Sequence, residues 1–439
     1  MVVGGDPGGM GAISAARALR PDLEVVAFEQ GSWTSYSACG IPYLVGGEVA
    51  RVDDLVARSP EKHREAGIDV RLHHRVTALD LDRGEVEVHD LEAGQTRREG
   101  YDHLLLGTGG VPIRPDLPGI DLGLVHGVQT LDDAVHLLDH AERIGSDRVV
   151  VVGGGYIGLE MAEAFVRRGA DVVLVERADH VMATLDPDMA ELVEEALRRF
   201  GVDVQLGCDV TGFDEKAVVT GDGTLPADLV VLGLGVAPNS DLAAAAGIEL
   251  GVKRAIRVDR RQATSADAVW AAGDCCESTH LVSGEPVYVA LGTVANKQAK
   301  VAGRNIGGGN AEFPGVLGTA ISKICSTEVA RTGLGTREAQ AAGFDLVTAT
   351  IDATTRSGYL PEAPPVKVKL LAERGSGRLL GAQIVGGAGA AKRIDTCAVA
   401  ITARMSVQDV LDLDLAYAPP FSSVWDPIQS AAREAVKLV

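Results

Sequence analysis

The chain has 439 residues, of which 46% are hydrophobic and 4% aromatic, and its formal net charge is −20. This length allows two or three domains of about 150 residues each, and the charge disfavours nucleic acid and membranes as partners. No apolar run reaches the roughly 18 residues of a membrane span, and no secretory signal is recognisable. The six cysteines have neither C-x-x-C nor zinc-ligand spacing, so we expect a cytoplasmic protein with free thiols and no metal.

The first glycine-rich turn follows a short apolar run that begins at Val2. A helix is predicted over residues 10–19, and a strand over residues 25–28 that ends at an acid. Glycines let the backbone approach a pyrophosphate, the helix N-terminus supplies N–H groups, and an acid about 20 residues on binds a ribose diol. Asp6 replaces the middle glycine, so the motif is imperfect. The nucleotide-binding candidates of this turn are Gly4, Gly8, Gly9 and Glu29.

Two strands later in the chain end in turns of small residues. The strand over residues 104–106 leads into Thr108 and Gly109, and the strand that starts at Val269 leads into Gly273 and Asp274. Either turn alone is typical of an ordinary α/β protein. All four segments in this order would be hard to obtain by chance, so these two turns strengthen the interpretation of the first copy as a nucleotide-binding fold.

A complete G-x-G-x-x-G occupies residues 153–158. A buried strand over residues 149–152 precedes it, a helix over residues 159–168 follows it, and the next strand ends at Glu176. Strand, turn, helix and acid are therefore all in the positions that a dinucleotide requires. The binding glycines of this second copy are Gly153, Gly155 and Gly158.

The order of these four segments resembles that of the flavoprotein disulfide reductases with two dinucleotide-binding domains, and the resemblance covers essentially the whole chain. It implies an α/β fold with two Rossmann-like domains and a C-terminal α+β dimerisation domain. It also implies a homodimer with FAD on the first fold and NAD(P)H on the second. The implied domains are a split FAD-binding domain (1–113 and 243–315), an NAD(P)H-binding domain (114–242) and a dimerisation domain (316–439).

The resemblance also assigns roles to individual residues. It implies that Glu29 holds the adenosine ribose of FAD and that Asp274 holds the ribityl chain. It implies that Tyr156 gates the nicotinamide pocket, for which turn packing is the alternative, and that Glu160 lies near the nicotinamide–flavin contact. A carboxylate at Glu176 accepts a hydrogen bond from a free 2′-hydroxyl and repels a 2′-phosphate, so NADH is favoured, with NADPH still open.

The segment over residues 35–43, S-x-x-x-C-G-x-P-Y, carries the predicted redox centre, Cys39. It resembles the single-cysteine branch of the family: coenzyme A disulfide reductases, persulfide reductases, and NADH oxidases and peroxidases. Leu44 stands where the dithiol members have their second cysteine, so the partner sulfur must come from the substrate. Ser35 matches a substrate-binding position. A cysteine near a helix N-terminus can have a lowered pKa, and the thiolate is its reactive form.

Two tyrosines of the C-terminal half match the coenzyme A disulfide reductases. By that resemblance Tyr359 and Tyr417 reach across the dimer into the partner's cysteine site, where a phenol can donate a proton to a departing thiolate. The alternative for both is packing at the dimer interface. Residues 366–370 alternate like a strand, so their two lysines are expected on a solvated face.

The substrate is less well defined than the redox centre. Pro7 occupies the position of a histidine in the peroxidases and oxidases, and it cannot transfer a proton. Coenzyme A binders have polar or basic residues where this chain has Ala15, Ala18 and Ala38, and phosphate groups require such donors. The prediction is a reductase of a low-molecular-weight disulfide or persulfide.

Several alternatives remain open at this point. They are an NADH oxidase or peroxidase that cycles a Cys39 sulfenic acid, an electron-transfer flavoprotein reductase and a redox sensor. The adjacent Cys275 and Cys276 are interpreted as packing residues, with a vicinal disulfide as the alternative.

Overall fold

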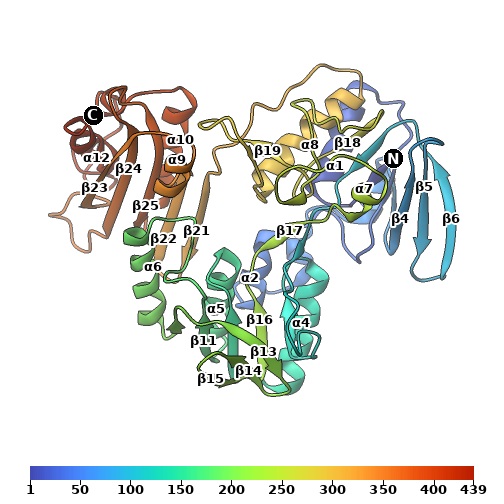
Figure 1. Ribbon diagram of the computed structural model, residues 1–439, viewed down its shortest axis with the longest axis horizontal. Coiled ribbons are helices and arrows are strands. Elements are labelled where there is room, and N and C mark those ends of the chain that lie inside the picture. The colour runs from blue at the N-terminus through green and yellow to red at the C-terminus, as the bar shows by residue number, and fades with distance from the viewer.

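The computed structural model describes residues 1–439, and its first unit is built on a sheet of five parallel strands in the order β18-β7-β1-β2-β3 (Figure 1). These strands are β1 (Val2–Val3), β2 (Val26–Phe28), β3 (Asp69–Arg71), β7 (Leu104–Leu106) and β18 (Val269–Ala271). Strand β18 lies far along the chain from its neighbour β7, so the chain leaves this unit and later returns to it. Strands β4 (His74–Asp80), β5 (Glu85–Asp90) and β6 (Gln95–Gly100) form an antiparallel sheet beside it.

Helices α1 (Pro7–Leu19) and α8 (Gly292–Ile306) pack against each other in this first unit. Their backbones approach so closely that a Cβ at Gly303 would lie 2.1 Å from the carbonyl oxygen of Ala12. Glycine is therefore required there on steric grounds, and the contact holds the returning segment against the first nucleotide fold.

The second unit has its own sheet of five parallel strands, in the order β12-β11-β10-β16-β9. The strands are β9 (Val125–Gly127), β10 (Arg148–Val152), β11 (Asp171–Val175), β12 (Asp203–Gln205) and β16 (Leu229–Leu232). The helices are α4 (Leu131–Ile144), α5 (Tyr156–Arg167) and α6 (Pro187–Phe200). A small antiparallel sheet is formed by β13 (Val210–Asp214), β14 (Ala217–Thr220) and β15 (Gly223–Pro226).

A two-stranded antiparallel sheet marks where the chain passes from the first unit to the second and back. It pairs β8 (Gly110–Pro112) with β17 (Val236–Pro238). Residues 229–238 form one of the longest apolar runs of the sequence, but they do not form a single strand. The run is divided between β16 and β17, and Gly235 between the two strands has a φ of +83°. The predicted boundaries at residues 113/114 and 242/243 lie close to this crossing and remain predictions.

The third unit has an antiparallel sheet in the order β21-β22-β25-β24-β23. Its strands are β21 (Ala320–Ile324), β22 (Thr327–Gly333), β23 (Leu346–Thr354), β24 (Pro365–Glu373) and β25 (Leu379–Gly386). Its helices are α9 (Thr336–Ala341), α10 (Ile394–Thr402), α11 (Val407–Leu411) and α12 (Pro427–Val436). Figure 1 shows this unit and the first unit on opposite sides, with the second unit below and between them.

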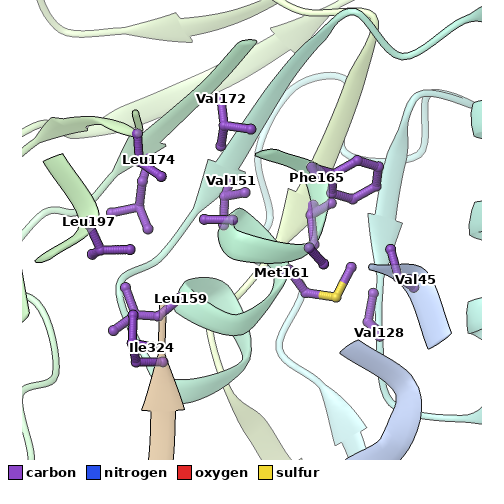
Figure 2. Packing of buried hydrophobic residues seen from close by; sticks show 14 of the residues in the cluster. Val45, Val128, Val151, Leu159, Met161, Phe165, Val172, Leu174, Leu197 and Ile324 are labelled. Atoms are coloured by element: carbon purple, nitrogen blue, oxygen red, sulfur yellow. The ribbon is translucent and has the colours of Figure 1, made fainter. Parts of the chain in front are cut away.

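One hydrophobic cluster joins all three units around helix α5 (Figure 2). Val45 comes from the first unit, Leu159 and Phe165 from α5, and Ile324 from the third unit; each is buried. Burying side chains of this size stabilises the folded state by about 1.5–3 kcal/mol each. The units are therefore held together by a common core, and the segment around Cys39 has a fixed position relative to the second fold.

Polar contacts also attach the third unit to the second, and they correct one prediction. Lys369 on β24 is buried, with Nζ 2.8 Å from Asp186 and 2.7 Å from Asp188. Lys367, two residues earlier, pairs with the exposed Asp352. The prediction of a solvated face is therefore wrong for Lys369, because the second unit covers that part of β24.

Candidate active site

The first glycine turn is a backbone cradle in which side chains would collide. Gly4 has a φ of +107°, and a Cβ there would lie 2.1 Å from the carbonyl oxygen of Gly107. A Cβ at Gly9 would lie 2.0 Å from the Gly4 oxygen, and one at Gly8 would lie 2.7 Å from the Ala272 oxygen. Helix α1 begins at Pro7, three residues before the predicted start, so its N–H groups point into this cradle. The geometry fits the pyrophosphate of a dinucleotide.

The second turn repeats this construction. Gly153 has a φ of +105°, and a Cβ at Gly158 would lie 1.9 Å from the Gly153 oxygen. Helix α5 begins at Tyr156, directly after the exposed Gly155. The three glycines predicted from the second motif therefore lie together at one helix N-terminus, where the residues fit a second dinucleotide.

The two acids that follow the turns make matching hydrogen bonds. Glu29 accepts from the Gly5 N–H at 2.8 Å and from the Gly31 N–H at 2.7 Å. Glu176 accepts from the Gly154 N–H at 2.7 Å and from the Ala178 N–H at 2.8 Å. Each carboxylate thus ties its strand end to its glycine turn, and each oxygen has further capacity to accept a ribose hydroxyl.

The other predicted cofactor residues meet at the C-terminal ends of β7 and β18. Thr108 is fixed by Asn239: its Oγ1 donates to the Asn239 carbonyl oxygen at 2.5 Å, and the Asn239 amide donates to the Thr108 carbonyl at 3.1 Å. Gly109 and Gly273 have φ values of +70° and +90°. Burial raises the pKa of Asp274 to about 6, and its carboxylate has no hydrogen-bond partner in the chain. A ligand hydroxyl group would satisfy this carboxylate.

Cys39 lies in a single 3₁₀ turn, Ala38–Gly40, that leads into the short helix α2 (Ile41–Val45). Helix α2 packs against α5 and α4 of the second unit, and the Cys39 side chain is exposed. Although solvent reaches the side chain, the thiol is partly buried. This partial burial raises the pKa of the Cys39 thiol, and the carboxylates of Glu160 and Asp274 raise it further. The expectation of a lowered pKa is therefore wrong for the chain alone, because burial and the two acids together outweigh the short helix.

Tyr156 and Glu160 lie one turn apart at the start of α5. The Tyr156 hydroxyl is buried without a hydrogen-bond partner, and a buried phenol normally has one. Glu160 accepts from the Ser322 hydroxyl at 2.6 Å, and burial raises the pKa of its carboxyl. Both residues can therefore form further hydrogen bonds where the two nucleotide folds meet.

Ser35 has a buried partner that the sequence did not indicate. Its Oγ lies 2.9 Å from Nε2 of His63, which is 3% exposed and whose Nδ1 has no partner. The Ser35 backbone has a φ of +53° and is held by the Gly5 carbonyl and the Ala57 N–H. No sequence pattern connects residues 28 positions apart in different elements, so His63 and Ser322 become visible only in the fold.

Tyr359 and Tyr417 lie in loops of the third unit and are 75% and 46% exposed. Other large apolar side chains of this unit are also exposed, namely Val399, Phe421, Val424 and Trp425. Monomeric proteins seldom expose such a set.

The remaining cysteines are buried and unpaired. Cys275 Sγ donates to the Leu106 carbonyl at 3.4 Å, and Cys276 Sγ to the Gln298 amide oxygen at 3.5 Å. This agrees with their interpretation as packing residues. No group of three or more potential ligands could hold a metal ion, and no helix is long and apolar enough to cross a membrane.

The structure defines a flavoprotein reductase of the disulfide reductase type. It combines two nucleotide folds, an exposed cysteine between them and a third unit with exposed apolar side chains. The family model "Pyridine nucleotide-disulphide oxidoreductase" matches residues 1–300, and the dimerisation domain of the same family matches residues 319–427. The chain belongs to this family. The family and fold class predicted from the sequence are therefore confirmed, as is an oxidoreductase that works with FAD and NAD(P)H.

Individual relatives are similar over their whole length or most of it. The chain is 38% identical to the NAD(P)H sulfur oxidoreductase (CoA-dependent) of Pyrococcus furiosus, over 99% of this chain and 98% of that protein. It is 36% identical to an NADH oxidase of Methanocaldococcus jannaschii, over 100% and 98%. The solved structure of an NAD-dependent persulfide reductase from A. fulgidus has a TM-score of 0.96 at 38% identity, over 99% of this chain and 82% of that one.

Proposed function

We propose that this protein uses NADH to reduce a low-molecular-weight disulfide or persulfide through Cys39. The observation that carries the proposal is that Cys39 alone among the six cysteines is exposed, between the two nucleotide folds. FAD and NADH supply the two electrons when bound. The named relatives that act on sulfur compounds support the same chemistry.

The sulfur chemistry balances with one protein thiol. The Cys39 thiolate attacks a sulfur of the substrate R–S–S–R, which forms Cys39–S–S–R and releases R–S⁻. Two electrons then break the new S–S bond, release the second R–S⁻ and regenerate the Cys39 thiolate. Two protons from solvent give two thiols in total. Because residue 44 is a leucine, no second protein thiol resolves the mixed disulfide.

The choice of nicotinamide and the assembly are parts of the same proposal. Glu176 places a carboxylate at the end of β11, which favours the 2′-hydroxyl of NADH over a 2′-phosphate. A homodimer would cover the exposed apolar face of the third unit and bring Tyr359 and Tyr417 to the partner's Cys39. Six unpaired cysteines favour the reducing cytoplasm.

The helix α1 side of the site supports a substrate other than coenzyme A disulfide itself. Ala15 and Ala18 on this helix, and Ala38 beside Cys39, carry no polar group. The two basic residues of this region also make contacts within the chain. Arg17 donates to the Ala66 carbonyl at 2.5 Å, and Arg20 pairs with Asp22 at 3.0 Å. Each guanidinium thus already has partners within the chain, and together with the loss of polar side chains at the three alanine positions this favours a smaller disulfide or persulfide.

The test is to replace Cys39 with serine and to measure NADH oxidation with a disulfide, with an artificial dye and with oxygen. We expect disulfide reduction to be lost and dye reduction, which needs only the flavin, to persist. Disulfide reduction that survives in Cys39→Ser would exclude the proposal and favour an electron-transfer reductase. Ser37→Ala, an exposed neighbour without a side-chain bond, is the matched control.

An NADH oxidase is the second candidate, and the M. jannaschii relative favours it. Wild-type turnover with oxygen that no disulfide stimulates would support it. Mass spectrometry of the purified protein, before and after reduction, separates the two. A small thiol released from Cys39 indicates disulfide chemistry, whereas a sulfenic acid indicates oxygen or peroxide.

A further inference from the structure

The hairpin formed by β21 and β22 reaches from the third unit to helix α5 and contacts two of its acids. Ser322 Oγ donates to Glu160 Oε1 at 2.6 Å. Lys323 Nζ lies 3.1 Å from Glu163 Oε1, and the Cys325 N–H donates to Glu163 Oε2 at 2.7 Å. The unit expected to pair subunits therefore also touches the reductive site of its own chain.

Glu160 depends on a single partner for its orientation. The Ser322 hydroxyl is the only group in the chain that donates to it, because Lys323 is directed to Glu163 and to the Cys325 carbonyl. A glutamate side chain has three rotatable bonds, and fixing it in one orientation costs rotamer entropy. A hydrogen bond to a carboxylate is strong enough to offset this cost.

The surroundings place Glu160 beside the redox centre. Its negative charge contributes to the raised pKa of the Cys39 thiol. It also borders a small polar pocket at the junction of the three units, lined by Pro42, Tyr43, Glu48, Glu160, Glu163, Ala164, Arg167 and Lys323. A carboxylate held at this junction can interact electrostatically with a cofactor bound against the start of α5.

We propose that Ser322 is a positioning residue that holds the Glu160 carboxylate toward the bound nicotinamide. A nicotinamide ring is neutral when reduced and positive when oxidised, so a fixed anion beside it favours hydride donation. The inference rests on the proposed placement of the nicotinamide on the second fold. It adds that a residue of the third unit sets the efficiency of flavin reduction.

The first experiment measures binding to the FAD-loaded protein. NAD⁺ is compared with 1,4,5,6-tetrahydro-NAD, a neutral analogue that donates no hydride, by fluorescence titration. Ser322→Ala should lower the preference for NAD⁺ by about tenfold, since a hydrogen bond to a charged group is worth roughly that factor. Ser322→Thr, which keeps the hydroxyl, should restore the preference. Ser326→Ala is the matched control, because Ser326 is exposed at the tip of the same hairpin.

The second experiment follows single-turnover reduction of the flavin by NADH against pH. Burial already raises the pKa of Glu160, and the Ser322 hydrogen bond opposes that rise. Without this bond the neutral acid is favoured, so in Ser322→Ala the loss of rate at low pH should begin at higher pH. The same substitution in a Glu160→Gln background should have no further effect.

Any of three results would overturn the inference. Ser322→Ala could match Ser326→Ala in both experiments, or it could slow flavin reduction equally with and without Glu160. A Glu160→Gln variant that still prefers NAD⁺ would overturn it as well. The first experiment measures binding alone and the second ends at the reduced flavin. Neither involves Cys39, so failure of the proposed disulfide chemistry leaves their outcome unchanged.

Discussion

The ammonium group of Lys369 lies 2.8 Å from the carboxylate of Asp186, although the two side chains are only 9% and 7% exposed. The pair joins strand β24 of the third unit to the start of α6 in the second. Asp186 also accepts from the Thr336 N–H and hydroxyl, at 3.0 and 2.5 Å. A buried ion-pair network adds little net stability compared with apolar residues of similar size. Removing one partner is nevertheless strongly destabilising, because it leaves a buried charge unpaired.

Lys369→Ala is expected to destabilise the protein by about 3–5 kcal/mol, because Asp186 and Asp188 lose their cation. Urea unfolding followed by circular dichroism measures the loss. Lys367→Ala is the matched control: its partner Asp352 is 80% exposed, so its loss costs at most about 1 kcal/mol. Equal effects of the two substitutions would mean that Lys369 is not buried between the units.

Glu176→Gln is expected to raise kcat/KM for NADPH relative to NADH by about tenfold, because it removes the charge that repels a 2′-phosphate. Steady-state kinetics with a dye as acceptor give the ratio. Glu29→Gln, which changes the equivalent acid of the first fold, should leave the ratio unchanged, and a change there would contradict the assignment of the two folds.

FAD affinity is expected to fall as the pH rises through 7. Burial raises the pKa of Asp6 to about 7, and the charge of Glu29 adds to this, so Asp6 becomes an anion beside the pyrophosphate cradle in this range. The expected loss is about tenfold between pH 6 and 8. Fluorescence titration of the apoprotein measures it, and Asp6→Asn should flatten the dependence.

The same proton affects the stability of the apoprotein. The folded chain holds the Asp6 proton more tightly than the unfolded chain does, so this residue costs stability increasingly as pH rises from about 4 to about 7. The Asp6→Asn variant should therefore gain stability relative to wild type over that window. An unchanged pH dependence of both FAD binding and unfolding would show that Asp6 is not buried.

Alkylation of Cys39 in the apoprotein is expected to accelerate with pH beyond the range of an ordinary thiol, because burial, Glu160 and Asp274 together raise its pKa. Asp274→Asn should speed iodoacetamide labelling at pH 8 by removing one of these charges. Asp222→Asn, an exposed acid of another unit, should not. Mass spectrometry identifies the labelled cysteine, and labelling that levels off at neutral pH would contradict the prediction.

Tyr359 and Tyr417 are expected to act on the partner's cysteine. Cys39→Ser chains and Tyr359→Phe/Tyr417→Phe chains should each be impaired alone. Refolded together, they should recover about a quarter of the wild-type disulfide reduction, because half the dimers are mixed and each has one complete site. No recovery would mean that both tyrosines serve their own chain or only pack at the interface.

The local features of this protein could be predicted from its sequence. The two glycine turns, their helices and the acids that follow them have a local sequence pattern, because positive φ angles and contacts such as Gly9 with Gly4 and Gly158 with Gly153 involve residues near in the chain. The pattern therefore identified the family, the two nucleotide folds and the candidate cysteine. Leu44 excluded a protein dithiol because it replaces the second cysteine, and Pro7 disfavoured a dedicated peroxidase or oxidase because it cannot transfer a proton.

Contacts between distant segments were decided only by the tertiary structure. An alternating strand shows that Lys367 and Lys369 share a face, but not that the second unit covers only Lys369. The raised pKa of Cys39 comes from burial of the thiol and from two acids more than a hundred positions away, and Ser322 meets Glu160 across 162 positions. The burial of a side chain and its interactions with distant charges depend on which surfaces of the units pack against one another. A local sequence pattern contains no information about that packing.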